Sequence, residues 1–295
     1  MNRKGKGKNE KPSMEKIPPW LELPEGIWAN ILRTLGVEEI LKTAEKVCTT
    51  WRRICKEPST WRVINMCCYE EEHSDMGYHL KKMCRYAVDR SQGELVDIYL
   101  DYFATDKLLQ YISERSGKMK RLSIACCYFK VCDGLVEAVQ KLPLLEELSL
   151  THTAITTEGI EALGCSCPQL KSFVLNNSLY MGSGDDSDKE DERNEEALAI
   201  AKNLPTLHHL QLIGNSMTNK GLKAILDSCP HLVSLDLRLC KFVSLNEVLS
   251  SRISGQIKDV KYPHDSLAGL KFSFEACGDE DLSDGMSEED MSDDY

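Results

Sequence analysis

A leucine motif recurs along most of this chain at nearly constant spacing. The motif places apolar residues at its first, fourth and sixth positions, and its six copies begin 24, 26, 25, 37 and 25 residues apart. The copies start at Leu95, Met119, Leu145, Leu170, Leu207 and Leu232. A period of this length indicates a repeat solenoid, because a single repeat cannot bury its own apolar side chains and must stack on its neighbours.

Each copy predicts a strand, and the residues between copies predict a helix. Runs such as Gly159–Leu163 and Gly221–Leu226 are typical of the helical parts, and Ile257 opens a worn seventh copy. Trp61–Met66 predicts a further strand ahead of the repeats, and the apolar residues from Leu80 to Val88 trace one helix face. We expect a parallel sheet on the concave side, helices on the convex side, and the motif leucines between them.

The one long step contains an insertion. Twelve polar residues from Gly182 to Arg193 account for its excess over 25, and the wider segment 181–196 holds eight acidic and two basic residues. This acidic insert is either a solvated loop, a gate for the concave surface or a recruiter of a basic partner.

Ahead of the repeats, apolar residues stand at helical spacing. Ile27, Ile31 and Leu35 follow one another at intervals of four, and Gly36 stands where a left-handed residue would close a helix. A second apolar stripe predicts one helix from about Glu38 to Cys55. A segment of roughly 40 residues cannot form its own core, so either the rest of the chain or a second protein covers these side chains.

The order and spacing of these residues resemble the F-box. The resemblance covers about Ile17 to Met66, with Leu23-Pro24 at its start and Glu57-Pro58-Ser59-Thr60-Trp61 at its exit. It implies three short helices, with a break near Lys42–Ala44, that dock on a Skp-type adaptor holding a cullin and a RING ubiquitin ligase. By motif position the adaptor-binding residues are Leu23, Pro24, Ile27, Ile31, Leu32, Leu35, Leu41, Val47, Cys48 and Trp51. Gly26 and Thr60 depart from the usual acidic and bulky apolar residues, and we expect weaker packing at most. A helical subdomain packed only on its own chain is the alternative.

The repeats resemble the cysteine-containing leucine-rich repeat of F-box proteins. Cys127, Asn215 and Cys240 stand eight positions into their copies, where that repeat has Asn or Cys. The arrangement as a whole is similar to short plant F-box/leucine-rich-repeat proteins. The resemblance, over about Pro19 to Tyr262, implies an α/β fold with an F-box over 17–66 and a leucine-rich-repeat solenoid over 67–262. The composition of the termini predicts a disordered basic arm at 1–16 and a disordered acidic tail at 263–295.

The strand residues that alternate with the buried leucines predict a binding surface for a target protein. Such residues face the concave side of a solenoid, which is the usual recognition surface. The candidates are Asp97, Tyr99, Asp101, Tyr102, Arg121, Glu147, His152, Asn176, His209, Gln211, Asp236 and Arg238. Tyr99 and Tyr102 are the preferred anchors because exposed aromatic residues often dominate binding energy.

The net charge of -11 is concentrated in short segments. Residues 1–16 carry a net charge of +4, and residues 275–295 hold ten acidic residues and no basic one. The folded part is nearly neutral and has no basic stripe with interleaved aromatics, so we expect no nucleic-acid partner. Neither a membrane span nor a secretory signal is expected, which predicts a protein of the nucleus, the cytoplasm or both.

No motif in the sequence predicts chemistry. The 13 cysteines lack paired C-x2-C spacing, so we interpret most as small buried side chains. His208 and His209 would point to opposite faces of a strand and cannot share an ion. Phosphate-loop, H-E-x-x-H and G-x-S-x-G motifs do not occur. We therefore expect no metal, no cofactor and no enzymatic activity.

Together these patterns predict the substrate-recognition adaptor of a Skp–cullin–F-box ubiquitin ligase, acting in ubiquitin-dependent degradation. A non-degradative scaffold with the same two surfaces is the first alternative, and target half-life separates the two. An enzyme is the second alternative, and it would keep its activity after losing the adaptor.

Overall fold

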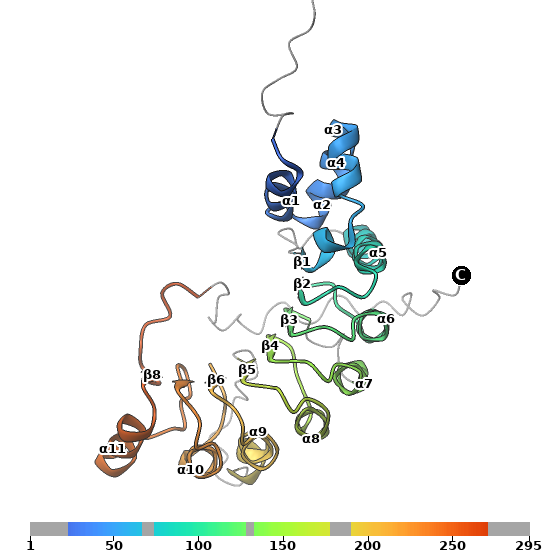
Figure 1. Cartoon of the computed structure of the whole chain (residues 1–295). Coiled ribbons are helices and arrows are strands. Elements are labelled where there is room, and N and C mark those ends of the chain that lie inside the picture. Colours follow the sequence, from blue (N-terminus) through green and yellow to red (C-terminus); the bar gives the residue numbers. More distant parts are fainter. Residues whose placement is uncertain (1–22, 67–73, 128–132, 178–189, 271–295) are drawn as a thin grey trace, which may run out of the picture.

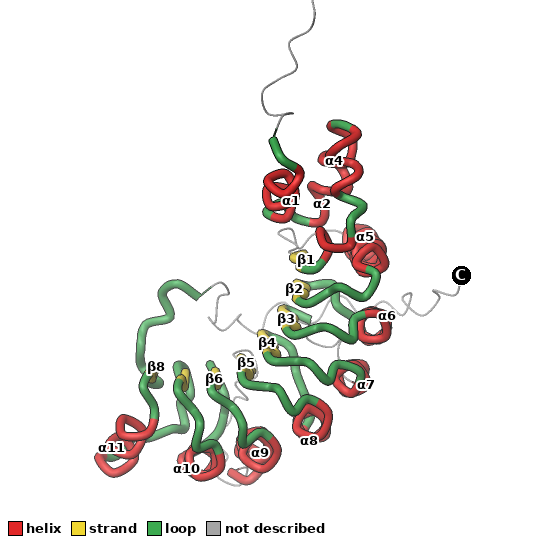
Figure 2. The backbone as a smooth tube through the Cα atoms, viewed as in Figure 1, coloured by secondary structure: helices red, strands yellow, loops and turns green. Residues whose placement is uncertain are grey.

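A computed structural model of the chain describes residues 23–66, 74–127, 133–177 and 190–270. The basic arm at 1–16, most of the acidic insert and the acidic part of the C-terminal segment lie outside these ranges. In Figure 1 the strands lie along the inner side of an arc and the longer helices lie along its outer side. The tube view in Figure 2 shows loops joining the outer helices to the strands that follow them. The predicted solenoid is confirmed.

Eight parallel strands form one sheet, and their order in the sheet is their order in the chain. They are β1 (Val63–Met66), β2 (Asp97–Asp101), β3 (Arg121–Ala125), β4 (Glu147–Thr151), β5 (Ser172–Asn176), β6 (His209–Gln211), β7 (Ser234–Asp236) and β8 (Asp259–Lys261). Each strand after β1 occupies a predicted motif, including the worn seventh copy at β8. Parallel neighbours need a long crossover, which the intervening helices supply.

The convex side is formed by one helix per repeat (Figure 1). These helices are α5 (Ser74–Ser91), α6 (Asp106–Arg115), α7 (Asp133–Gln140), α8 (Thr157–Ser166), α9 (Glu190–Asn203), α10 (Asn219–Ser228) and α11 (Glu247–Gln256). Several begin at a side-chain cap, as where Thr105 Oγ1 accepts from the Leu108 amide of α6. The last residues of the predicted acidic insert, from Glu190 to Glu196, form the first half of α9 and are not a loop.

The core is the stack of motif leucines that the repeat predicts. Strand register aligns Ile98 with Leu122, and Leu122 with Leu148, so equivalent side chains of successive repeats lie in one row. All three are at most 1% exposed. The predicted Cys and Asn positions also point inward, and the Cys240 thiol donates to the Leu212 carbonyl at 3.0 Å. Seven of the nine described cysteines are buried, which agrees with their interpretation as small core residues.

The chain leaves several strands through a residue in the left-handed region. Tyr102, Cys126, His152 and Leu239 have φ between 51° and 67°, and Gly214 has φ of 73° at the equivalent position. Only one of these five positions carries glycine, although this conformation is costly for other residues. The surrounding repeats therefore fix a sharp turn directly after the strand.

The N-terminal helices pack onto the first end of the solenoid. They comprise α1 (Glu25–Arg33), α2 (Val37–Glu39), the π-helical η2 (Ile40–Ala44), α3 (Glu45–Val47), α4 (Thr49–Ile54) and the 3₁₀ segment η3 (Pro58–Trp61). Their buried residues Leu32, Val37 and Ile40 belong to the same apolar cluster as Leu80 and Cys84 of α5. The apolar core thus runs without interruption from the helices into the repeats.

Two local predictions in this region are wrong. The helix does not break at Lys42–Ala44, where it widens into the π-helical η2, but at Cys48, which is extended with φ of -158°. Gly36 is not left-handed: its φ is -70°, and it precedes α2 as the N-cap residue. The Cys48 sulfur accepts from the Trp51 amide at 3.4 Å and so starts α4, which the apolar spacing alone could not reveal.

Candidate functional site

An apolar row lies exposed on α1, at the end of the molecule farthest from β8 (Figure 1). Leu23, Ile27 and Ile31 are 39%, 46% and 39% exposed. Ile27 and Ile31 are four residues apart and share one side of α1, and Leu23 lies just before the helix begins at Glu25. Pro24 is exposed beside them, and Val47 on α3 is also exposed. Leaving large apolar side chains in water is unfavourable by about 1.5 to 3 kcal/mol for each one that could be buried. The apolar row is therefore a candidate docking surface for another polypeptide.

The other residues predicted to bind the adaptor lie behind this row. Leu32 is fully buried, so the prediction that it faces a partner is wrong. It points inward because it lies one residue after Ile31, about 100° around the helix. Leu35, Leu41 and Trp51 are half-buried and pack against the core, and Cys48 is half-buried. These residues support the surface more than they form it.

Sequence reasoning missed Trp28 as a support of the apolar row. Its ring is buried and lies 5.0 Å from the ring of Trp51, at an interplanar angle of 56°. The pair joins α1 to α4 from behind the exposed row. Its signal was present in the sequence, since Trp28 and Leu32 are four residues apart and share a helix face.

The concave surface presents seven of the twelve residues predicted for target binding. Asp97, Tyr99, Tyr102, Arg121 and Gln211 are half-buried, while Glu147 and His209 are exposed. Arg121 Nε donates to Asp97 Oδ2 at 2.7 Å, and this hydrogen bond raises the pKa of the guanidinium. The Tyr99 hydroxyl donates to Asp101 Oδ2 at 2.9 Å, so this candidate anchor is held in place by its own strand.

The expected exposure is wrong for the other five residues, which are all buried: Asp101, His152, Asn176, Asp236 and Arg238. Asp101 and Asn176 end their strands, where the chain already turns inward. His152 occupies the left-handed position that follows β4. Simple alternation along a strand fails at its last residue because the backbone no longer follows the pleat.

Asp236 and Arg238 form a buried ion pair. Arg238 Nε lies 2.9 Å and 3.1 Å from the two carboxylate oxygens of Asp236, and Nη2 lies 2.6 Å from Oδ2. Arg238 Nη1 also donates to the Ser266 carbonyl at 2.9 Å. This contact holds part of the segment 263–270, which we had expected to belong to a disordered tail. A fork of this kind fixes geometry strongly, because both charges are satisfied by directed hydrogen bonds.

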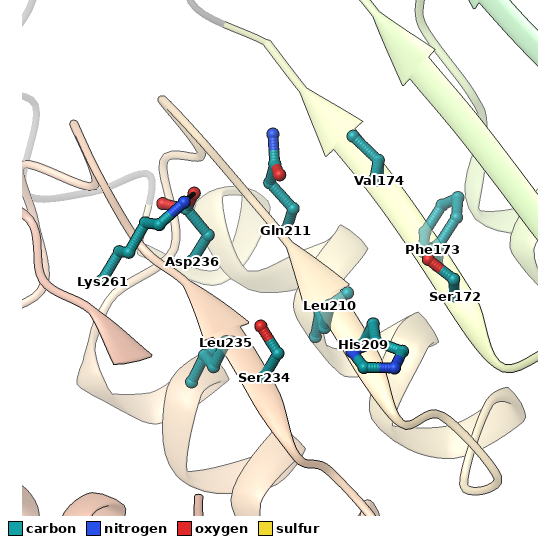
Figure 3. Close-up of a pocket in the computed structure, with 10 residues that line it drawn as sticks. All are labelled: Ser172, Phe173, Val174, His209, Leu210, Gln211, Ser234, Leu235, Asp236 and Lys261. Atoms are coloured by element: carbon teal, nitrogen blue, oxygen red, sulfur yellow. Dashed lines mark ion pairs between the residues drawn. The ribbon is translucent and has the colours of Figure 1, made fainter. Parts of the chain in front are cut away.

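A hollow of about 110 Å³ lies on the concave face of the last four strands. Figure 3 shows its side chains, which come from β5, β6, β7 and β8. Ser172, His209, Gln211, Ser234 and Lys261 provide polar groups, and the Lys261 ammonium lies 3.7 Å from Asp236 Oδ2. The hollow is large enough for one polar side chain of a partner.

Glu196 on α9 is the described carboxyl group with the largest rise in pKa. Burial raises its pKa to about 7, although a hydrogen bond from Asn215 opposes this shift and nearby Glu195 adds to it. Asn215 Nδ2 donates to one carboxylate oxygen at 2.6 Å, and Asn177 Nδ2 donates to the other at 3.4 Å. The carboxyl group, at the last residue of the acidic insert, joins α9 to two loops that follow strands.

Neither a metal centre nor a membrane helix was found among the described residues. No group of three or more His, Cys, Asp and Glu side chains within them could hold a metal ion. Over the same ranges, no helix is long and apolar enough to span a bilayer.

An exposed helical docking row joined to a repeat solenoid defines the class of protein: a bivalent binding protein with one short helical module and one concave recognition surface. Residues 20–67 match the F-box-like family, and residues 141–164 and 203–226 match the Leucine Rich repeat family.

Curated relatives from Arabidopsis thaliana cover most of the chain. Putative F-box/LRR-repeat protein 23 is 42% identical over 85% of this chain and 55% of its own length. F-box protein SKIP19 is 44% identical over 84% of this chain and 78% of its own length, and Putative F-box/LRR-repeat protein 21 is 41% identical over 88% and 86%. The chain therefore spans about half of the first relative and more than three quarters of the other two. It belongs to the F-box/leucine-rich-repeat proteins, whose general role is that of an adaptor in Skp–cullin–F-box assemblies.

Proposed function

We propose that this chain is the target-recognition subunit of a Skp–cullin–F-box ubiquitin ligase and promotes ubiquitin-dependent degradation of its target. The apolar row binds a Skp-type adaptor, through which a cullin and a RING subunit are recruited. The concave surface binds a target protein. The function is positional, because both partners held on one chain reach a high effective concentration toward each other.

The single observation that supports this proposal best is the exposure of Ile27 and Ile31 on one side of α1, together with Leu23 just ahead of it. These three positions are among those at which the resemblance to the F-box implies contacts with the adaptor. The neighbouring residues Trp28 and Leu32 are buried, so the helix divides cleanly into a core side and a docking side.

The test is a titration of the purified chain with a Skp-type adaptor, followed by reconstitution with the cullin and RING subunits. The proposal predicts saturable one-to-one binding and ubiquitin transfer to a captured target that depends on the chain. A chain that folds alone and ignores the adaptor at micromolar concentrations would refute it.

The concave features support the second half of the proposal. The hollow on β5 to β8 supplies directed polar groups, and the half-buried Tyr99 supplies an aromatic ring farther along the same sheet, on β2. Affinity capture under proteasome inhibition, with the intact chain beside an Ile27→Ala/Ile31→Ala variant, separates targets from ligase components. Targets stay bound to both proteins, whereas ligase components are lost from the variant.

A non-degradative scaffold remains the second candidate, because both surfaces would serve it equally well. The half-life of a captured target, measured with and without this chain, decides between the two. Degradation predicts a longer half-life when the chain is absent.

A further inference from the structure

The junction between the F-box helices and the solenoid is apolar on one side and polar on the other. On the apolar side, Val37 and Ile40 belong to the same buried cluster as Leu80 and Cys84 of α5. Apolar contact of this kind is strong but has no preferred direction. By itself it holds two bodies together without fixing the angle between them.

Arg90, in the last turn of α5, provides the polar side of the junction. Its Nη1 lies 2.7 Å from Glu45 Oε1 on α3, and both side chains are mostly buried, at 14% and 18% exposed. The same nitrogen donates to the Cys55 carbonyl at 3.1 Å, directly after α4. The Arg90 guanidinium, on the first helix of the solenoid, thus contacts both α3 and the end of α4 in the F-box region.

Aromatic rings hold this guanidinium in place. Its carbon lies 4.6 Å from the ring centre of Tyr86 on α5 and 5.8 Å from that of Trp61 on η3, and Nη2 also donates to the Tyr86 hydroxyl. The Trp61 indole donates to the Cys55 carbonyl at 2.8 Å, so this carbonyl accepts from both Arg90 and Trp61. A planar, fully charged guanidinium fixes geometry in a way that a flexible ammonium does not.

We infer that Arg90 is a positioning residue that sets the angle between the adaptor-docking row and the concave recognition surface. The inference rests on the proposed function, because the angle matters only if the two surfaces hold different partners. The angle then determines which part of a bound target faces the ligase. Arg90 itself is mostly buried, so it acts through the junction and not through contact with a partner.

The angle can be measured on the full chain by single-molecule energy transfer between α3 and α11. Donor and acceptor dyes are attached at Lys46 and Val248, both exposed, through non-natural amino acids, because the chain holds 13 cysteines. The variants are Arg90→Ala, Arg90→Lys and Glu45→Gln. Arg115→Ala is the matched control, since Arg115 also stacks on a tyrosine ring at 3.8 Å and pairs with an aspartate, but within the solenoid.

Arg90→Ala and Arg90→Lys are expected to widen the distance distribution, and Glu45→Gln to widen it less. The control should keep the wild-type width. Adaptor affinity is measured on unlabelled protein. The Kd of every variant should stay within about threefold of the wild-type Kd.

A distribution for Arg90→Lys as narrow as that of wild type would overturn the inference, and so would equal widening in the control. If Arg90→Ala fails to fold, Arg90→Lys and Glu45→Gln decide the matter, since both keep most of the local packing. Failure of the wild-type chain to bind an adaptor would refute the proposed function, whereas the width of the distribution is measured without any adaptor.

Discussion

Shortening the exposed apolar row should weaken adaptor binding without unfolding the protein. An isoleucine-to-alanine change removes three carbons, worth about 2.4 kcal/mol if they were fully transferred from water. Ile27 and Ile31 are 46% and 39% exposed in the free chain, so only that part remains to be buried on docking. Each substitution should therefore cost about 1 kcal/mol of binding, and the double variant about 2 kcal/mol, or roughly 30-fold in Kd.

The assay is isothermal titration of a Skp-type adaptor into wild type, Ile27→Ala/Ile31→Ala and Val248→Ala. Val248 is the matched control, because it is 79% exposed but lies on α11, at the far end of the solenoid. By the same arithmetic, urea unfolding should show a loss of roughly 1 to 1.5 kcal/mol of stability for each substituted isoleucine, whose other half is already buried in the free chain. Val248→Ala should be unchanged within about 0.5 kcal/mol, as expected for an exposed position. Leu32→Ala should behave differently and lose about 2 to 5 kcal/mol of stability, because Leu32 is fully buried.

Two outcomes would refute the reasoning. A loss of less than about threefold in the double variant would mean that these side chains stay exposed in the complex. An equal loss in Val248→Ala would mean that the measured effect has nothing to do with the docking row.

Three further predictions concern the solenoid. The folded-state pKa of Glu196 lies near 7, above its unfolded value, so the folded chain binds this proton more tightly and its stability falls as pH rises through 7. Since the shift corresponds to at most about 3 kcal/mol, Glu196→Gln should raise the melting temperature at pH 8 and lose that advantage at pH 5. Gly221→Ala should destabilise the folded state by about 1 to 3 kcal/mol, because a Cβ there would lie 2.7 Å from a Cβ of the neighbouring helix. The control Gly255→Ala has open space around it and should be neutral or slightly stabilising in the same calorimetric scan. Asp236→Ala should cost about 3 to 5 kcal/mol in urea unfolding, since it leaves Arg238 buried without its main partner, and a cost below 1 kcal/mol would contradict this reading.

The sequence predicted the solenoid well because the repeat encodes it many times over. Every motif leucine must be buried in the same way, so a wrong assignment of strand or core positions in one copy is corrected by comparison with the other copies. The row on α1 was equally predictable, since side chains four residues apart must share a helix face. What failed were local predictions, namely the orientation of Leu32, the helix break near Lys42–Ala44, the left-handed Gly36 and the exposure of single polar side chains, for which no repetition exists.

Those failures have local physical causes. Asp101 is buried because the chain turns at the end of β2, and the alternation rule does not extend into a turn. Asp236 and Arg238 are buried because each provides the other with a charged partner, which a pattern of residue types does not encode. Arg90 escaped notice for the same reason, since its partner Glu45 lies 45 residues away in the chain.

The uninterrupted core limits how F-box/leucine-rich-repeat proteins of this kind can acquire new target specificities. Because β1 pairs with β2 and the F-box helices cover the apolar side of α5, the docking module also serves as the end cap of the repeat array. A shortened chain that begins after Met66 would lose that cap and expose leucines meant for the interior. A new target specificity is therefore easier to reach by changing residues on the strands of the concave surface, or repeats near α11, than by exchanging the whole F-box region at its junction with the solenoid.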